Sequence, residues 1–332
     1  MFYRKTVAAA LGAAAMLAAL PALAADTQWT YYTYFGANDK PTQLHRAFAE
    51  DVLKASDGRL KIDVFASGEL PYKSSDVLKA VATNQIQMGD AAIGSVAGDV
   101  PELNALSMPF SCTSIDKFYD KAAAVAQPYL EDVFEGKFGA VPLMQWVMPP
   151  QQLWLREPVD SIAGLKGVKA RAWNREQVQM MQLLGGTGVT ITPAEVIPAL
   201  QRGVVDGAFT AAVPALDWKF NEVTKFGFMM NVTLAHQVAT VNKAAFDALP
   251  EDLQKLLRDK AIDWAPKYRE AMIEGDKTAR AALKEAGMTL HDATPEEEAE
   301  LRATTRSIWD DWTKQSGEKA GKMLHDVAQA CE

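Results

Sequence analysis

The sequence predicts an α/β protein of two lobes, each a mostly parallel sheet flanked by helices, with a long helix spanning both lobes. Three observations lead to this prediction. The chain has 332 residues, 48% of them apolar. A chain of this length is longer than a single hydrophobic core usually supports. Strand and helix patterns alternate along its N-terminal half, as in right-handed βαβ units. No Ser/Gly-rich or Pro-rich linker separates the halves, so we expect lobes that hinge about shared strands or a shared helix.

The first 25 residues have the pattern of a signal peptide. Arg4 and Lys5 form a short basic start, residues 6–20 are uncharged and rich in Ala and Leu, and Ala22-Leu23-Ala24 is typical of a cleavage site. We expect cleavage after Ala24 or Ala25, with an uncleaved N-terminal anchor as the alternative. No other apolar run approaches the ~18–20 residues that cross a membrane. The mature chain is therefore expected to be exported and soluble, which in a bacterium means the periplasm or beyond.

The segment after the signal peptide alternates between strand and helix patterns. Leu44, Phe48 and Val52 recur at four-residue spacing, which is typical of an amphipathic helix, and Gly58 follows its end. Alternating apolar and polar residues mark the neighbouring strands. The expected elements are a strand at 29–35, a helix at 38–56, a strand at 60–65, a helix at 74–83 and a strand at 88–93.

A second lobe is expected to begin near Met148-Pro149-Pro150. Its strands, separated by helices, are predicted at 168–172, 189–192 and 204–209. Thr192–Glu195 and Thr294–Glu297 both read Thr-Pro-x-Glu, which predicts capping boxes at two helix starts. Residues 250–286 form a helical pattern of ~55 Å, which Pro266 should bend or break. We assign residues 26–148 plus about 237–270 to lobe I, and residues 149–236 plus about 271–332 to lobe II.

Charge and motif spacing argue against several classes of protein. A formal charge of −8 is unsuited to nucleic acid, because phosphate contacts need a surplus of Lys and Arg. The four histidines form no HxxxH or HxH pair, so no metal site is expected. Residues 185–188 lack dinucleotide and P-loop spacing, and residues 94–98 miss the nucleophile elbow by one position. We therefore expect no cofactor and no enzyme, a secreted enzyme being the remote alternative.

The two cysteines are Cys112 and Cys331, too few for a Cys-rich zinc module or an iron–sulfur cluster. Export would place them in an oxidising compartment, where a disulfide between them is allowed. Such a bond would hold the C-terminal tail on the N-terminal half of the chain. The alternative is one buried and one frayed free thiol.

Aromatic residues and one arginine lie near predicted strand ends, where open α/β sheets bind their ligands. For any single aromatic residue a place in the core is the favoured explanation, but the group indicates a ligand crevice. Its members are Tyr31, Tyr32, Tyr34, Phe35, Trp146, Trp154, Trp173, Phe209 and Trp218. Arg171 lies near the end of a predicted strand, just before a helix. Its rigid fork of donors matches a carboxylate; a surface salt bridge is the alternative.

Two segments resemble motifs of the solute-binding proteins of tripartite ATP-independent periplasmic (TRAP) transporters, the DctP family. Residues 165–171, Leu-Lys-Gly-Val-Lys-Ala-Arg, are similar to that family's GLKGxKxR segment, and residues 197–207 are similar to its xxALQxGxVDG segment. Residues 67–70, 108–110 and 249–254 support them in the same order along the chain. The resemblance implies the architecture of a periplasmic binding protein, which closes on an organic acid and delivers it to a permease of small and large integral membrane subunits.

The resemblance also implies roles for individual residues. Arg171 is implied to clamp the ligand carboxylate, with Asn174 beside the ligand. Gln151 lies in the region, about twenty residues before the arginine, that often supplies a second polar contact. Phe209 and Thr210 stand where the family usually has an acid and an amide. The strand that often offers a carboxylate or polar contact ends here in Ala92.

These departures favour an apolar ligand. One cation, a few amides and hydroxyls, and aromatic walls suit a monocarboxylate with an aromatic or branched apolar body. The expected walls are Trp173 and Phe209, with Tyr34 and Phe35 from the other lobe. A sugar acid would leave polar groups unmatched, at ~1–3 kcal/mol each. The alternatives are a small 2-oxo or 2-hydroxy acid, a dicarboxylate, or a ligand-sensing role in a signalling system.

Overall fold

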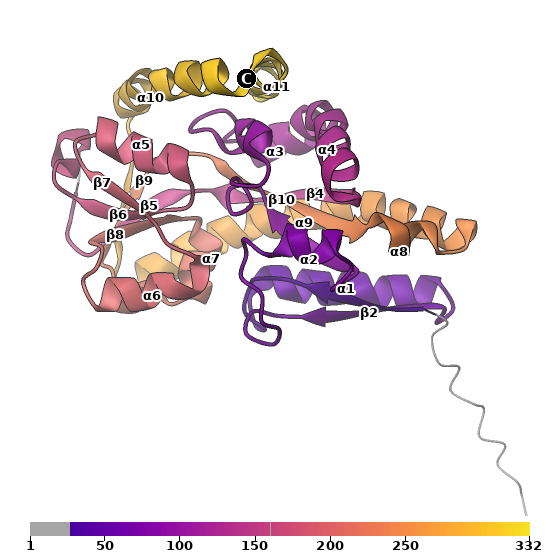
Figure 1. The fold of residues 1–332 in the computed structure, drawn as a ribbon. Helices are drawn as coiled ribbons and strands as arrows, with labels where there is room; N and C mark the ends of the chain where they lie inside the picture. The colour runs from indigo at the N-terminus through magenta and orange to yellow at the C-terminus, as the bar shows by residue number, and fades with distance from the viewer. Residues whose placement is uncertain (1–26, 160) are drawn as a thin grey trace, which may run out of the picture.

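The computed structural model describes residues 27–159 and 161–332. The predicted signal peptide and its cleavage site lie outside the described residues. The described chain forms two lobes, each built on one β-sheet with helices packed against it, as Figure 1 shows. The predicted two-lobe α/β fold is therefore confirmed, whereas the residue bounds of the lobes stay a prediction.

Lobe I is built on a sheet with the strand order β2-β1-β3-β10-β4. The βαβ units make β2, β1 and β3 parallel, while β10 runs antiparallel to both β3 and β4. Its strands are β1 (Thr27–Tyr32), β2 (Leu60–Phe65), β3 (Met88–Ala92), β4 (Ala140–Pro150) and β10 (Leu234–Asn242). Its helical segments are α1 (Lys40–Ala55), α2 (Val77–Ala82), a 3-10 segment (Pro101–Ser107), α3 (Ile115–Lys117), a π segment (Phe118–Ala122), α4 (Ala123–Phe138) and α8 (Lys243–Asp247).

Lobe II is built on a sheet with the strand order β11-β9-β5-β8-β6-β7. β5 runs antiparallel to its neighbours β8 and β9, and the other pairs are parallel. The strands are β5 (Gln152–Leu155), β6 (Lys169–Ala172), β7 (Thr187–Thr190), β8 (Gly207–Thr210), β9 (Phe226–Met229) and β11 (Thr289–Asp292). The helices are α5 (Arg175–Leu183), α6 (Pro193–Gln201) and α7 (Ala212–Asp217), with short 3-10 turns at Ile162–Leu165 and Phe220–Glu222.

The chain crosses between the lobes along two adjacent strands. β4 continues into β5 with Gln151 between them, and β9 leads back into β10. At this crossing the Gln151 amide donates to the Thr233 carbonyl, and the Val232 amide donates to the Gln151 carbonyl, both at 2.9 Å. The two crossings are thus hydrogen-bonded to each other, and they form the hinge that the lobes share.

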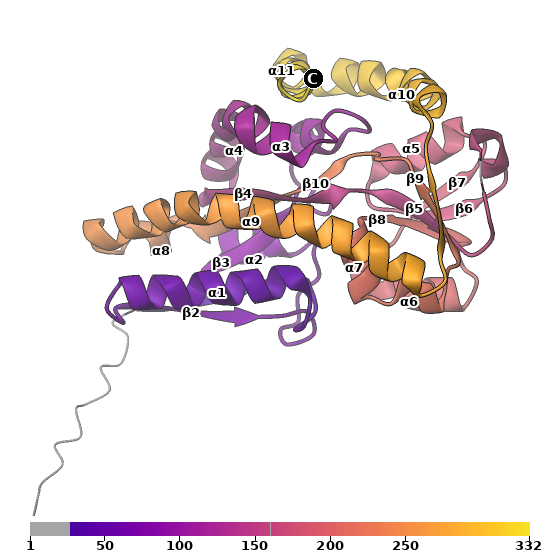
Figure 2. The ribbon, with the colours of Figure 1, turned by 180° about the vertical axis from the view of Figure 1, so that it is seen from behind.

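The long helix α9 (Glu251–Glu285) is the third connection and spans both lobes in Figure 2. It packs against α1 and β4 in lobe I and against α7 in lobe II. Pro266 lies inside α9 without breaking it, so the expectation of a break is wrong. A proline removes one backbone hydrogen bond. The buried side chains of Trp264, Tyr268 and Met272 hold this face of the helix on the protein and stabilise its continuity.

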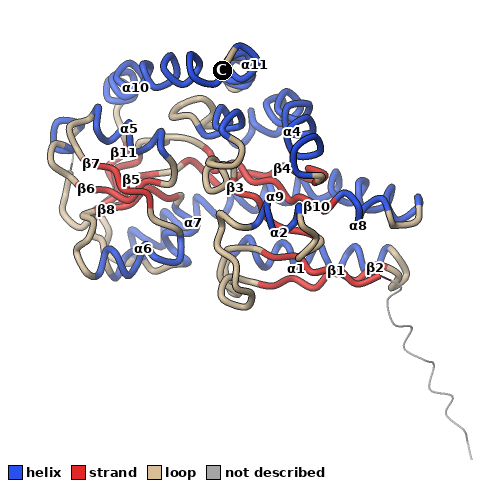
Figure 3. The backbone as a smooth tube through the Cα atoms, in the orientation of Figure 1, coloured by secondary structure: helices blue, strands red, loops and turns tan. Residues whose placement is uncertain are grey.

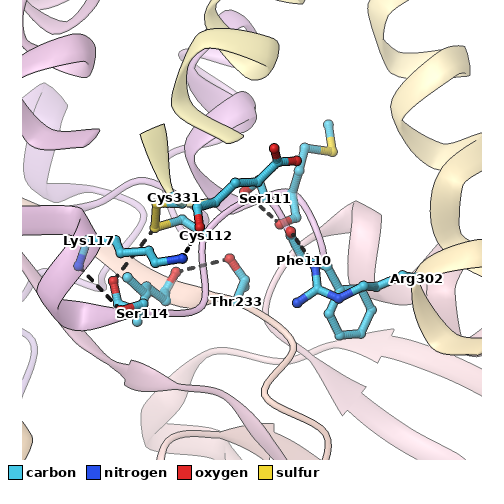
Figure 4. The surroundings of a disulfide bond; sticks show 11 residues. Phe110, Ser111, Cys112, Ser114, Lys117, Thr233, Arg302 and Cys331 are labelled. Atoms are coloured by element: carbon cyan, nitrogen blue, oxygen red, sulfur yellow. Dashed lines mark hydrogen bonds between the residues drawn. A yellow bond between two sulfur atoms is a disulfide. The ribbon is translucent and has the colours of Figure 1, made fainter. Parts of the chain in front are cut away.

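Two C-terminal helices bridge the lobes from outside, as the tube in Figure 3 shows. α10 (Pro295–Ser316) packs on α5 of lobe II, and α11 (Glu318–Ala330) packs on α4 of lobe I. Gly317, with φ 86°, makes the turn between them. A disulfide joins Cys331, after α11, to Cys112 in lobe I, with 5.3 Å between the Cα atoms (Figure 4).

One of the two predicted capping boxes forms. At the start of α10, Thr294 accepts from the Glu297 amide while the Glu297 side chain accepts from the Thr294 amide. The box predicted at Thr192 is wrong. There the Glu195 amide donates to the Thr192 backbone carbonyl at 3.0 Å, and the Thr192 hydroxyl instead donates to the Glu195 carboxylate at 2.7 Å.

Candidate functional site

A small pocket lies between the lobes and against the hinge. Lobe I contributes the loop after β1 and part of the hinge, and lobe II contributes the ends of β6 and β8 and the starts of α6 and α7. The pocket encloses about 30 Å³ and opens toward a wider hollow of about 330 Å³ with which it shares three residues. Its lining residues are Tyr34, Phe35, Met148, Gln151, Arg171, Trp173, Pro193, Thr210, Ala211, Pro214, Trp218 and Ala235.

Arg171 is the charged residue of this lining. It lies on β6, and the backbone around it fixes its guanidinium: Nε donates to the Ile191 carbonyl at 2.8 Å and Nη1 to the Phe209 carbonyl at 2.7 Å. Its side chain is only 3% exposed. Burial lowers the pKa of Arg171 to about 10, so the group stays charged at neutral pH.

No ion pair to Arg171 is found among the described residues, and Nη2 makes no hydrogen bond to them. A buried cation is costly unless an anion and hydrogen-bond acceptors accompany it. The two carbonyls take the Nε donor and one of the two Nη1 donors, which leaves the second Nη1 donor and both Nη2 donors. Paired Nη1 and Nη2 donors can meet a carboxylate in a bidentate fork. The arrangement around Arg171 is therefore suited to an anionic ligand.

Gln151 brings a primary amide into the same pocket from the hinge. It is 4% exposed, and its Oε1 accepts a hydrogen bond from Nε2 of Gln177 on α5. Oε1 of Gln177 in turn accepts from the Trp173 backbone amide at 2.7 Å. Gln177 was not predicted from the sequence. A buried helical glutamine belongs to no motif, and its partners become visible only when β6, α5 and the hinge are brought together.

Trp173 reaches across to lobe I. Its Nε1 donates to the Ser95 hydroxyl at 3.1 Å, and its ring lies directly on the backbone of Gly94. A Cβ atom at Gly94 would lie only 2.7 Å from two atoms of the Trp173 ring. This contact therefore requires glycine at position 94 when the lobes are closed as they are here.

The loop after β1 supplies the aromatic wall from lobe I. The rings of Tyr34 and Phe35 are stacked with their centroids 4.3 Å apart. The Tyr34 hydroxyl donates to Oε1 of Gln237 at 3.0 Å. Burial raises the pKa of Tyr34 well above its usual value, so the phenol stays neutral.

A second set of contacts between the lobes lies near the mouth of the pocket. Trp218, after α7, donates from Nε1 to the Asp39 carboxylate at 3.1 Å, and the Lys40 amide donates to Asp217 at 3.3 Å. Two carboxylates from different lobes thus approach each other. Burial, with a further contribution from the charge of Asp39, raises the pKa of Asp217 to about 6.

Six of the residues predicted from the sequence line the pocket: Arg171, Trp173, Thr210, Gln151, Tyr34 and Phe35. The other three lie elsewhere in the described structure. Asn174 caps α5 by accepting from the Gln177 amide, and its Nδ2 donates to the Ser107 carbonyl at 3.4 Å. Phe209 is fully buried and offers its carbonyl to Arg171. Ala92 is buried at the end of β3, paired with Gln237.

The aromatic group predicted at strand ends divides between the pocket and the protein core. Tyr34, Phe35, Trp173 and Trp218 line the pocket. The others are core residues, each under 2% exposed: Tyr31, Tyr32, Trp146, Trp154 and Phe209. The division follows the secondary structure: the four pocket residues lie just after β1, β6 and α7, whereas the five core residues lie within strands.

Two further findings concern the described residues only. No group of three or more His, Cys, Asp or Glu side chains within them is arranged to hold a metal ion. None of the helices in residues 27–159 and 161–332 combines the length and apolarity needed to cross a membrane.

Comparison with known proteins shows the family. Residues 34–315 match the model of the bacterial extracellular solute-binding protein family 7, DctP. The C4-dicarboxylate-binding periplasmic protein DctP of Rhodobacter capsulatus is 26% identical over 324 residues, covering 96% of each chain. A Bordetella pertussis extracytoplasmic solute receptor that binds pyroglutamic acid aligns with TM-score 0.85 and 26% identity, covering 91% of this chain and 99% of that one.

A third relative shows how ligands vary on this fold. A TRAP periplasmic solute-binding protein from Chromohalobacter salexigens, with bound D-glucuronate, aligns with TM-score 0.85 at 20% identity, covering 91% of this chain and 99% of that one. The family consists of substrate-binding receptors. Taken with the two-lobe fold and the pocket between the lobes, these matches show that the chain belongs to the DctP family of TRAP transporter solute-binding proteins.

Proposed function

We propose that this protein is exported to the periplasm, binds a compact organic monocarboxylate in the pocket between its lobes, and delivers it to the small and large membrane subunits of a TRAP permease. The observation that carries the proposal is Arg171, a buried guanidinium held by two carbonyls and without an ion-pair partner among the described residues. The ligand carboxylate would supply the missing anion, in a bidentate charge-assisted pair.

The character of the lining supports a single carboxylate. Arg171 is the sole charged member of the lining set, so a second carboxylate would enter a buried space without a cation to receive it. A dicarboxylate, as bound by the Rhodobacter relative according to its name, is therefore the weaker alternative. The membership of a family of substrate-binding receptors supports a binding protein rather than an enzyme.

The polarity of the pocket supports a ligand with few hydroxyl groups. Most of its lining is apolar or aromatic. A sugar acid would bury hydroxyls that this lining cannot match, at ~1–3 kcal/mol each. Pyroglutamic acid, bound by the Bordetella relative, is a compact monocarboxylate of the proposed class, as are branched 2-oxo acids.

Closure explains how the permease would distinguish loaded from empty protein. Contacts such as Trp173 with Ser95 and Trp218 with Asp39 join opposite lobes. A ligand that bridges the lobes favours the closed form by the difference between its affinities for the closed and open forms. A sensor protein could read the same closed form, and that role is the second candidate.

The test is thermal unfolding of residues 26–332 with a panel of acids, each paired with its uncharged primary amide. The panel contains pyroglutamate, branched 2-oxo acids, aromatic acids, dicarboxylates and uronates. A ligand at 100 times its Kd should add ~2.7 kcal/mol of stability. We expect stabilisation by compact monocarboxylates and none by the amides. Stabilisation by dicarboxylates or uronates alone would overturn the proposed ligand class, and stabilisation by amides would overturn the role of Arg171.

A further inference from the structure

Gln177 and Gln151 form a pair of buried amides behind the pocket. Gln177 is fully buried in the first turn of α5, and Gln151 is the hinge residue between β4 and β5. Nε2 of Gln177 donates to Oε1 of Gln151. Gln151 lines the pocket, whereas Gln177 is not among the described lining residues.

The orientation of this pair follows from one backbone group. The Trp173 backbone amide can only donate, and it lies 2.7 Å from the Gln177 side chain, so the atom that faces it must be the oxygen. The nitrogen of Gln177 then faces Gln151 and must donate. Gln151 therefore presents its oxygen to Gln177, and its Nε2 group is left for the pocket. A flipped amide at either position would bring two donors or two acceptors face to face.

Arg171 also offers donors only. The side-chain acceptors that the lining offers are two hydroxyl oxygens. The Tyr34 hydroxyl gives its proton to Gln237, so its oxygen can only accept from a ligand. The Thr210 hydroxyl can rotate to serve as donor or acceptor. The fixed polar groups that face the ligand from Arg171 and Gln151 are thus all donors.

We propose that Gln177 is a positioning residue that holds Gln151 as a hydrogen-bond donor, so that the pocket selects monocarboxylates carrying a second, acceptor-only group such as a keto carbonyl. This inference rests on the proposed function. A hydroxyl in place of the carbonyl can still accept from Gln151, but its own proton must then find an acceptor. A hydroxyl proton buried without an acceptor should weaken binding about five- to a hundredfold.

The experiment compares matched ligand pairs by titration calorimetry. The probes are 4-methyl-2-oxopentanoate with 2-hydroxy-4-methylpentanoate, and 3-oxocyclopentanecarboxylate with 3-hydroxycyclopentanecarboxylate. The variants are Gln151→Leu, Gln177→Met and, as the matched control, Gln182→Met, which places the same substitution on an exposed position of the same helix. Thermal unfolding checks that each variant is folded.

Wild type and Gln182→Met should bind the oxo form about five- to a hundredfold more tightly than the hydroxy form in whichever pair binds. In Gln151→Leu and Gln177→Met this ratio should fall toward one. A merely structural role for Gln177 would weaken both members of a pair equally and leave the ratio unchanged, which would overturn the inference. Equal binding of oxo and hydroxy forms by wild type would overturn it too. If wild type bound no acid of the broader panel, the proposed function itself would fail.

Discussion

The contact between Gly94 and Trp173 allows one added methyl group to test closure of the lobes. In Gly94→Ala the new Cβ would lie 2.7 Å from Cδ2 and Cε2 and 2.8 Å from Cε3 of the indole ring. Unstrained carbon atoms approach to ~3.5–4.0 Å, so the methyl overlaps the ring by ~0.7 Å or more. The ring has little freedom to move away, since Nε1 is bonded to the Ser95 hydroxyl.

The expected cost is that of overpacking a buried contact, ~1–3 kcal/mol. Because Gly94 follows β3 of lobe I and Trp173 follows β6 of lobe II, the cost falls on the closed form. Ligand binding that requires closure should therefore weaken about five- to 150-fold. Unfolding of the ligand-free protein should change much less, because opening of the lobes relieves the overlap.

Titration calorimetry with an acid from the thermal panel measures this effect. Gly98→Ala is the control, because a Cβ there meets no atom within 4 Å and its φ is not in the left-handed region. We expect Gly98→Ala to bind as wild type does. Wild-type affinity in Gly94→Ala would refute the reasoning, since it would show that ligand binding does not bring Trp173 onto Gly94.

Three more predictions concern pH and the disulfide. Because burial and the charge of Asp39 raise the pKa of Asp217 to about 6 in this closed form, protonation of Asp217 favours closure. Ligand affinity should therefore rise about two- to fourfold from pH 7.5 to 5.5. Calorimetry of Asp217→Asn should show no such rise. Burial lowers the pKa of His236 to about 3. The free energy of unfolding, measured in urea, should therefore be constant above pH 6.5 and decrease at lower pH by at most ~1.4 kcal/mol per pH unit. The same pH dependence in His236→Phe would contradict this. Cys112 and Cys331 are 219 residues apart, so replacing both with serine should cost ~2–5 kcal/mol of unfolding free energy; equal urea midpoints for the two proteins would argue against it.

Local sequence patterns predicted the fold well because most elements carry their own signals. Alternation marked β2, and four-residue spacing marked α1. Tertiary contacts decided the rest. The strand predicted at 29–35 ends at Tyr32, which places Tyr34 and Phe35 on a loop where both can face the pocket. α9 continues through Pro266, because the large side chains around it are buried against both lobes.

The candidate site was predictable only where one residue carries the chemistry. Arg171 could be found, because a cation near the end of a buried strand is unusual and this one lies in a recognisable segment. Asn174 was expected beside the ligand, but its position directly before α5 is that of a helix N-cap, and a capping role explains it. The role of Gln177 depends on Gln151, 26 residues earlier in the chain, and on the Trp173 backbone, so no local pattern could reveal it.

The most direct test of the central claim is calorimetry of the best-binding acid and its primary amide with wild type and Arg171→Met. Methionine fills part of the buried space without charge or donors. We predict that wild type binds the acid at least about tenfold more tightly than the amide, and that Arg171→Met loses this preference while remaining folded. Wild-type affinity for the acid in Arg171→Met would contradict the account, because the carboxylate would then be held by some other group.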